Sequence, residues 1–175
     1  MKLAAAAMAL VMTSCTPLPV SYPVPEQRPI THGPEPEGLS SFLTFDNPRT
    51  AAHIISDILD APPGQSWRWT GQNPALKLKI ESTGNLRFRA RGAFPHQSHQ
   101  PLVPITLSVF LNDKLLDRVS YKAVGDFVFQ KDVSPKLLLE NGENKVRLEL
   151  DKVYIAADGV KLGMILAELG FEKRK

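Results

Sequence analysis

The sequence has little cysteine, little net charge and no long apolar run, and each shortage excludes a class of protein. A single cysteine among 175 residues excludes an internal disulfide framework and any zinc site built on two or more thiolates. A net charge of +3 does not by itself indicate a nucleic-acid-binding protein. The apolar run from Leu3 to Met12 falls short of the roughly 20 residues that a transmembrane helix needs. The composition therefore fits one globular domain plus a further segment of biased composition.

The N-terminus has the pattern of a targeting segment. Lys2 precedes the apolar run, and Met12-Thr13-Ser14-Cys15 follows it. This tetrapeptide resembles the lipobox of bacterial lipoproteins, although Met12 stands where leucine is usual. The resemblance implies that residues 1–14 are a signal peptide and that lipid on Cys15 anchors the protein to a membrane. Because Thr16 is not the aspartate typical of inner-membrane retention, it also implies the outer membrane. The alternative is an ordinary secretory signal with a chance cysteine.

Proline is concentrated directly after this signal, and we expect residues 15–38 to be the lipidated cysteine and a tether. The stretch has few large apolar residues and no periodicity, so it cannot bury a core. In polyproline II conformation roughly 23 residues reach up to about 70 Å. Seven of the 15 prolines lie here: Pro17, Pro19, Pro23, Pro25, Pro29, Pro34 and Pro36.

Residues 39–64 are expected to hold one short amphipathic helix and a connection. Asn47 and Pro48 are a favourable N-cap and first helical residue, and Pro62-Pro63-Gly64 ends the pattern. The polar side of this helix is not basic, which favours packing on the following domain over a membrane surface. Its apolar face would be Ala51, Ile54, Ile55, Ile58 and Leu59.

Residues 65–175 alternate apolar and polar side chains, which predicts a β-sandwich or jelly roll of about eight strands. Two runs, 76–80 and 86–90, are separated by turn residues 81–85, so we expect them to form a hairpin. We predict the last run to be a buried strand, although its leucines also fit a helical stripe. The other strand-like runs are Ile105–Asn112, Leu116–Lys122, Phe127–Lys131, Lys145–Tyr154 and Leu162–Phe171.

Three segments of this region resemble a galactose-binding-like jelly roll. The resemblance rests on the strand and turn Ile105–Asn112, on Asn141-Gly142-Glu143-Asn144 with the ladder 145–150 after it, and on Lys161-Leu162-Gly163 before the closing strand. It extends over about residues 65–172. It implies the jelly-roll fold and, since many relatives are accessory modules of larger enzymes, a carbohydrate-binding role.

A row of basic residues alternates outward along the predicted hairpin. On one face of adjacent strands such side chains sit about 5 Å apart and repel unless an anion or acidic neighbours cover them. One hypothesis is that the row binds an anionic envelope polymer, and the alternative is a solvated face of mixed charge. The row comprises Lys77, Lys79, Arg87, Arg89 and Arg91.

Trp67 and Trp69 are the second candidate site. Alternation places both rings on one face, with Arg68 on the other. An exposed ring would serve as a platform for a sugar, whereas a buried pair would belong to the core. The sequence leaves both interpretations open.

Catalytic chemistry is difficult to assemble from this sequence. The four histidines are His32, His53, His96 and His99, and the spacing of the last two in a loop is weak evidence for a metal. No phosphate-binding loop, HExxH motif or GxSxG motif is present. We therefore predict no catalytic residue, no metal, no cofactor and no nucleic acid.

The sequence indicates a lipid-anchored, non-catalytic envelope module that binds carbohydrate or an anionic envelope polymer. Two alternatives remain: a structural or assembly protein that packs on an envelope protein partner, and a small polysaccharide-acting hydrolase or lyase. A protein partner would require an exposed apolar patch, and a glycan a shallow groove with aromatic side chains and polar tips. A hydrolase or lyase would require two carboxylates, or a histidine and a carboxylate, that converge in a pocket.

Overall fold

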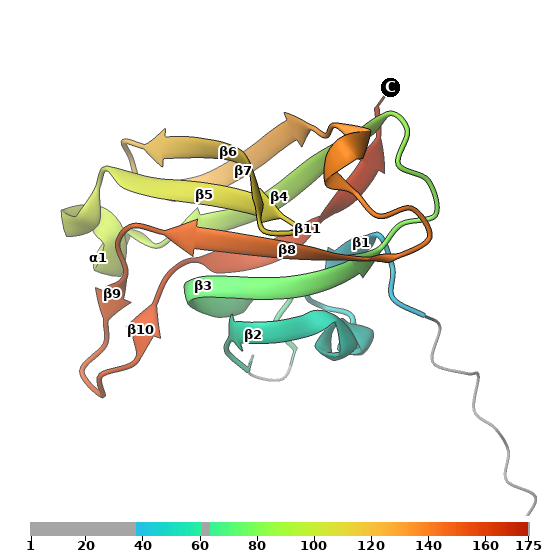
Figure 1. Cartoon of the computed structure of the whole chain (residues 1–175). Coiled ribbons are helices and arrows are strands. Elements are labelled where there is room, and N and C mark those ends of the chain that lie inside the picture. Colours follow the sequence, from blue (N-terminus) through green and yellow to red (C-terminus); the bar gives the residue numbers. More distant parts are fainter. Residues whose placement is uncertain (1–37, 61–63, 175) are drawn as a thin grey trace, which may run out of the picture. The chain divides into compact units, whose positions relative to one another are not determined.

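Two antiparallel sheets packed face to face form the domain, as the alternation predicts. The computed structural model describes residues 38–60 and 64–174 (Figure 1). One sheet has the order β2-β3-β8-β5-β6 and the other β1-β11-β4-β7, and β11 also pairs briefly with the start of β3. The fold is a mainly-β jelly-roll sandwich, which confirms the predicted fold class.

The elements have the following bounds. The strands of the sandwich are β1 Phe42–Thr44, β2 Ile54–Ile58, β3 Arg68–Lys79, β4 Leu86–Phe94, β5 Ile105–Leu111, β6 Lys114–Tyr121, β7 Gly125–Asp132, β8 Glu143–Leu150 and β11 Ile165–Lys173. A separate hairpin consists of β9 Tyr154–Ile155 and β10 Lys161–Leu162. The short helices are η1 Pro48–His53, α1 His96–His99, η2 Gln100–Leu102 and η3 Pro135–Leu137.

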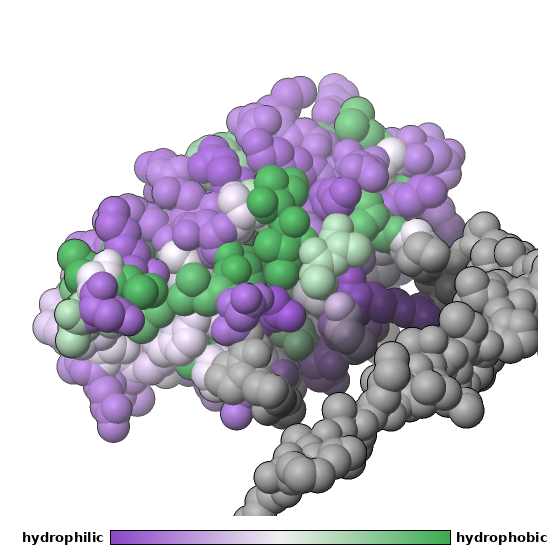
Figure 2. Space-filling model, turned by 90° about the horizontal axis from the view of Figure 1, so that it is seen from below, coloured by the Kyte–Doolittle hydropathy of each residue, from purple (hydrophilic) through white to green (hydrophobic). Residues whose placement is uncertain are grey.

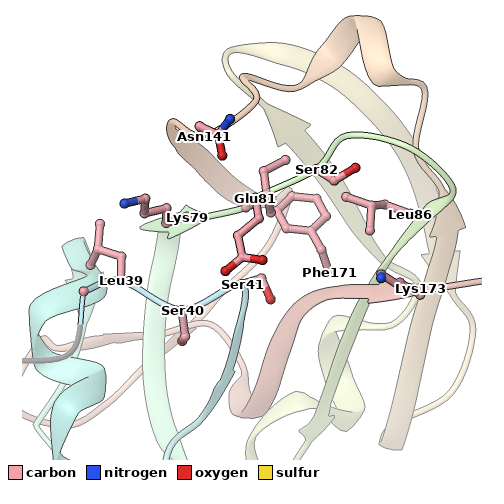
Figure 3. A pocket seen from close by; sticks show the side chains of 12 residues that line it. Leu39, Ser40, Ser41, Lys79, Glu81, Ser82, Leu86, Asn141, Phe171 and Lys173 are labelled. Atoms are coloured by element: carbon pink, nitrogen blue, oxygen red, sulfur yellow. The ribbon is translucent and has the colours of Figure 1, made fainter.

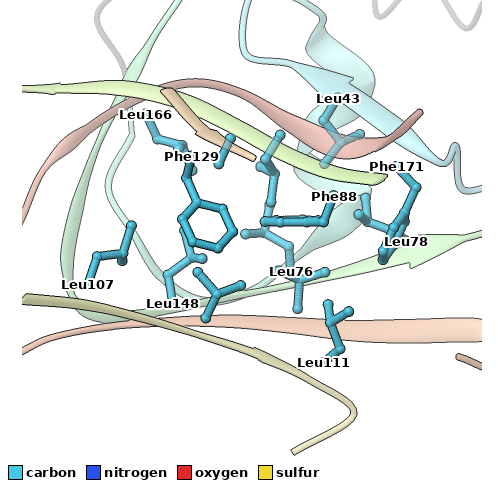
Figure 4. Close-up of a cluster of buried hydrophobic side chains, with 14 of the residues drawn as sticks. Leu43, Leu76, Leu78, Phe88, Leu107, Leu111, Phe129, Leu148, Leu166 and Phe171 are labelled. Atoms are coloured by element: carbon cyan, nitrogen blue, oxygen red, sulfur yellow. The ribbon is translucent and has the colours of Figure 1, made fainter. Parts of the chain in front are cut away.

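The core lies between the sheets and follows from period-two patterning. On β4 every second side chain is buried, and the arginines between them point outward. Phe88 is fully buried and makes edge-to-face contacts with Phe129 of β7 and Phe171 of β11, with ring centroids 6.1 and 5.5 Å apart (Figure 4). Such aromatic pairs stabilise the sandwich beyond the area that they bury.

The predicted N-terminal helix is shorter than expected. Asn47 does cap it, because its side chain accepts a hydrogen bond from the Arg49 backbone N–H. The turn is a 3₁₀ helix that ends at His53, and Ile54–Ile58 forms β2 against β3. β-branched residues favour strands, and here the free edge of β3 supplies the hydrogen-bonding partner. The prediction of an amphipathic helical face over residues 51–59 is therefore wrong.

The predicted hairpin of 76–80 with 86–90 is also wrong. β3 pairs with β2 and β8 in one sheet, whereas β4 pairs with β11 and β7 in the other. Residues 80–85 cross from one sheet to the other. Both strands alternate because each buries one face against the shared core, and that pattern is the same for strands that pair and for strands that face each other.

Other strand predictions are confirmed. Asn112 and Asp113 form the turn between β5 and β6, both with positive φ angles (49° and 64°), as a two-residue hairpin turn requires. The closing run, predicted to begin at Leu162, is the strand β11, but it begins at Ile165, and Leu162 belongs to β10. The predicted run 145–154 ends earlier, because β8 stops at Leu150 and β9 starts at Tyr154.

The signal peptide, Cys15 and nearly all of the tether lie outside the described residues. Within the described part of the chain, no helix is long and apolar enough to cross a membrane. Figure 2 views the molecule from the side on which Figure 1 places β2, and it shows a band of apolar side chains across this face between hydrophilic ones.

Candidate functional site

The predicted basic row does not exist as one face. Lys77 and Lys79 belong to β3, whereas Arg87, Arg89 and Arg91 belong to β4 in the opposite sheet. The error follows from the hairpin prediction, since only paired strands place alternate residues on a common face. The two groups of cations therefore cannot bind one polymer side by side.

The arginines of β4 are covered by acidic neighbours from the adjoining strands. Arg87 Nε lies 2.9 Å from Asp132 Oδ1 on β7. Glu168 of β11 forms ion pairs with the other two arginines. Its Oε1 lies 2.9 Å from Arg89 Nη1 and 3.2 Å from Arg91 Nε. The outer face of this sheet thus carries charges of both signs, which agrees with the alternative interpretation, a solvated face of mixed charge.

Glu168 holds Arg91 in place at the end of this charged strip. A register shift in β11 between Leu166 and Glu168 accompanies the outward carboxylate, whose side chain is only 13% exposed. Arg91 Nη2 donates to Glu168 Oε2 at 3.2 Å. This hydrogen bond, together with the negative charge, raises the pKa of Arg91. Arg91 is therefore a fixed cation with its remaining N–H groups available.

Lys77 is likewise partnered on the other sheet, while Lys79 lies at its end. Lys77 Nζ lies 3.9 Å from Glu143 Oε2 on β8. Lys79 is the last residue of β3 and is exposed. Neither lysine is near the groove described below.

The two tryptophans lie on one side, as predicted, but they differ in surroundings. Their rings meet edge to face with centroids 6.5 Å apart and an interplanar angle of 88°. Trp69 stacks on the imidazole of His99 at 6.1 Å. Trp67 instead lines a hollow on the surface. Both side chains are partly buried, and Trp69 faces His99 whereas Trp67 faces the hollow.

The hollow beside Trp67 is a groove of about 300 Å³, called here the Trp67 groove. Trp67 and Ile165 provide apolar walls, and Ala93 and Val128 extend them. Val128 is 52% exposed, so the apolar surface is open to solvent. Arg91 and Asp126 supply a cation and a carboxylate in the same lining. The groove therefore combines an aromatic surface with polar side chains of opposite charge.

Sequence reasoning named Trp67 and Arg91 but missed the other parts of this groove. β11 lies between β3 and β4 and brings Ile165 opposite both Trp69 and Ala93. Asp126 stands opposite Ala93 on β7. Nothing in the sequence marks Asp126 or Ile165, because their position depends on which strands are neighbours.

His99 stacks on Trp69, which in turn contacts Trp67 of the groove. His99 is fully buried, its Nε2 donates to the Gly163 carbonyl at 2.5 Å, and its Nδ1 accepts from the Ser98 hydroxyl at 2.7 Å. Burial lowers the pKa of His99, because it disfavours the charged form of the ring. His96, by contrast, is exposed. Among the described residues, no group of three His, Cys, Asp or Glu side chains is placed to hold a metal ion.

Comparison with known proteins gives matches among solved structures alone. No family model matches the sequence, and no curated protein matches it. A family 35 carbohydrate binding module from Clostridium thermocellum aligns with 77% of this chain and 100% of its own, at 10% identity and a TM-score of 0.43. A family 35 module from an environmental isolate aligns with 79% and 94%, at 12% identity and 0.45. An acetyl xylan esterase from Butyrivibrio proteoclasticus aligns with 78% of this chain and 34% of its own, at 11% identity and 0.43.

Proposed function

We propose that this domain is a non-catalytic carbohydrate-binding module and that the Trp67 groove is its binding site. The observation that carries the proposal is the partly exposed Trp67 ring in a groove that also presents Arg91 and Asp126. Aromatic rings stack on the apolar faces of sugars, and the surrounding charged groups hydrogen-bond to hydroxyls.

The electrostatics of the groove favour a glycan over a purely anionic polymer. Arg91 already shares its charge with Glu168, and Asp126 adds a second carboxylate to the site. Sugar hydroxyls both donate and accept hydrogen bonds, so they satisfy a guanidinium and a carboxylate together. A polyanion would satisfy only the guanidinium.

A glycan array tests this function. The full chain carrying Cys15→Ser would be applied to plant, microbial and host glycans, and hits would be quantified by calorimetry. Trp67→Ala and Arg91→Ala should each weaken binding at least about tenfold, since stacking and charged hydrogen bonds dominate such sites. Arg87→Ala is the matched control, because Arg87 lies on the same strand outside the groove. Glycan binding that survives Trp67→Ala would disprove this site, and an array without hits would disprove the function.

Membrane anchoring through Cys15 is the second part of the proposal. It is supported by the lipobox-like Met12-Thr13-Ser14-Cys15 after an apolar run, and Thr16 favours the outer membrane. Metabolic labelling with an alkyne fatty acid should label the full chain and not the Cys15→Ser variant. Fractionation should place the labelled protein in the outer membrane. Labelling that persists in the variant would contradict the anchor.

A further inference from the structure

A larger hollow lies at the opposite end of the sandwich from the Trp67 groove. Its volume is about 960 Å³, and we call it the end pocket (Figure 3). Lys79 ends β3 and Leu86 begins β4 at this pocket, whereas Trp67 precedes β3 and Ala93 lies near the end of β4. The two hollows are thus separated by the length of these strands.

The floor of the end pocket is apolar and belongs to the core. Phe171 of β11 is 3% exposed, and Ile80 and Leu86 are buried beside it. In Figure 3 the Phe171 ring lies at the centre of the pocket. This rigid floor keeps the pocket open, since core side chains do not collapse into it without leaving a void behind.

The rim carries three charged side chains in alternating sign. Lys79, Glu81 and Lys173 are all exposed, and Figure 3 places Glu81 between the two lysines. Several basic side chains elsewhere on the domain lie close to carboxylates, as Arg87 does to Asp132 and Lys131 to Asp117. No ion pair joins these three residues to one another or to other residues of the described ranges.

Neutral polar groups complete the lining. The Ser40 hydroxyl is used internally, because it donates to the Phe42 carbonyl at 2.8 Å. The side chains of Ser41 and Asn141 also line the pocket, and they make no hydrogen bond within the described part of the chain. They are therefore available to the amide groups of a ligand.

We propose that the end pocket binds a short zwitterionic peptide with free ammonium and carboxylate groups. The ammonium pairs with Glu81, the carboxylates pair with Lys79 and Lys173, and the peptide amide contacts Ser41 and Asn141. A purely anionic ligand would be repelled by Glu81 at the centre of the rim. An uncharged sugar would leave all three charges unpaired, and such a site discriminates against it.

Nuclear magnetic resonance titration of the ¹⁵N-labelled full chain carrying Cys15→Ser tests the proposal. The probe is the dipeptide Ala-Glu, which carries one ammonium and two carboxylates. We expect millimolar affinity, because each exposed ion pair changes an affinity by only about 1.5- to 5-fold. Shifts should centre on the amides of Glu81, Asn141 and Lys173. N-acetyl-Ala-Glu, which lacks the ammonium, should bind about two- to fivefold more weakly.

Charge-removing variants test which rim residue pairs with which charged group of the peptide. Glu81→Gln should remove the difference between Ala-Glu and its acetylated form, and Lys79→Ala with Lys173→Ala should weaken both peptides. Lys161→Ala is the matched control, because Lys161 is an exposed lysine of β10 outside the pocket. Trp67→Ala should leave peptide binding unchanged, so failure here and failure of the glycan function are distinguishable.

Three results would overturn the proposal. One is Ala-Glu binding that is unaffected by Glu81→Gln and by acetylation, since the ammonium would then have no partner. Another is the absence of shifts around the pocket at high-millimolar Ala-Glu. Tighter binding of inorganic phosphate than of Ala-Glu would also contradict it and would make the pocket a simple anion site.

Discussion

The side-chain amides of Asn112 and Asn144 are hydrogen-bonded to each other, from Nδ2 of Asn112 to Oδ1 of Asn144 at 2.9 Å. Asn144 is fully buried, and its Oδ1 also accepts from the Leu139 N–H at 2.7 Å. Asn112 Oδ1 accepts from the Lys145 N–H. The pair therefore ties the β5–β6 turn to the start of β8. Asn112 and Asn144 thus hold the fold and line neither hollow.

We predict that Asn144→Ala destabilises the domain by about 2–4 kcal/mol, because it leaves buried donors without acceptors. Urea unfolding measures this free energy. Glu140→Ala, at an exposed residue of the turn that precedes β8, should change it by less than about 0.5 kcal/mol. Equal effects of the two variants would contradict a buried network.

Glu168→Gln should lower the free energy of unfolding by about 1–3 kcal/mol. The change removes the charge shared by Arg89 and Arg91, and the Arg89 side chain is only 29% exposed. Glu172→Gln is the control on the same strand, since Glu172 stands opposite Arg87 and makes no ion pair with a described residue. Glycan affinity should fall with Glu168→Gln as well, because Arg91 loses its anchor.

The buried His99 predicts a pH dependence of stability. Burial lowers its folded pKa below the unfolded value of about 6.5, so the unfolded chain binds a proton more readily. The free energy of unfolding should therefore be highest above about pH 6.5 and fall as the pH drops toward the folded pKa, by at most about 1.4 kcal/mol per unit.

His99→Gln should flatten this slope, whatever it does to stability at neutral pH, whereas His96→Gln should preserve it because His96 is exposed. Tryptophan fluorescence offers a second readout, since Trp69 stacks on His99. A His99→Gln slope equal to that of the unsubstituted chain would contradict the prediction.

Alanine substitutions of the two tryptophans should have different effects on stability and on glycan binding. Trp69→Ala should lower the melting temperature more than Trp67→Ala, because Trp69 loses its stacking on His99 and leaves a void beside it. Trp67→Ala should mainly reduce glycan binding. Calorimetric melts of both variants, next to their glycan titrations, check this, and a reversed order of melting temperatures would contradict the assignment.

The sequence alone determined the local features of this protein. Alternation predicted β4, β5 and β8 and their buried faces, because a strand pattern reports which side chains leave water. Asn47 and Asn112-Asp113 predicted a helix start and a turn, since these depend on neighbouring residues only. Trp67 and Arg91 were candidates for their chemistry.

Only the tertiary structure decided which strands are neighbours, and with them the sites. β3 and β4 face each other across the core instead of pairing, which divided the basic row between two sheets. β11 inserted beside β4 and brought Glu168 to Arg91 and Ile165 to the Trp67 groove. Strand pairing is a contact between segments distant in sequence, and period-two patterning is the same for every partner. In this sequence, which has little cysteine and little net charge, local patterns thus determine the strands and turns. Its binding surfaces depend instead on long-range packing.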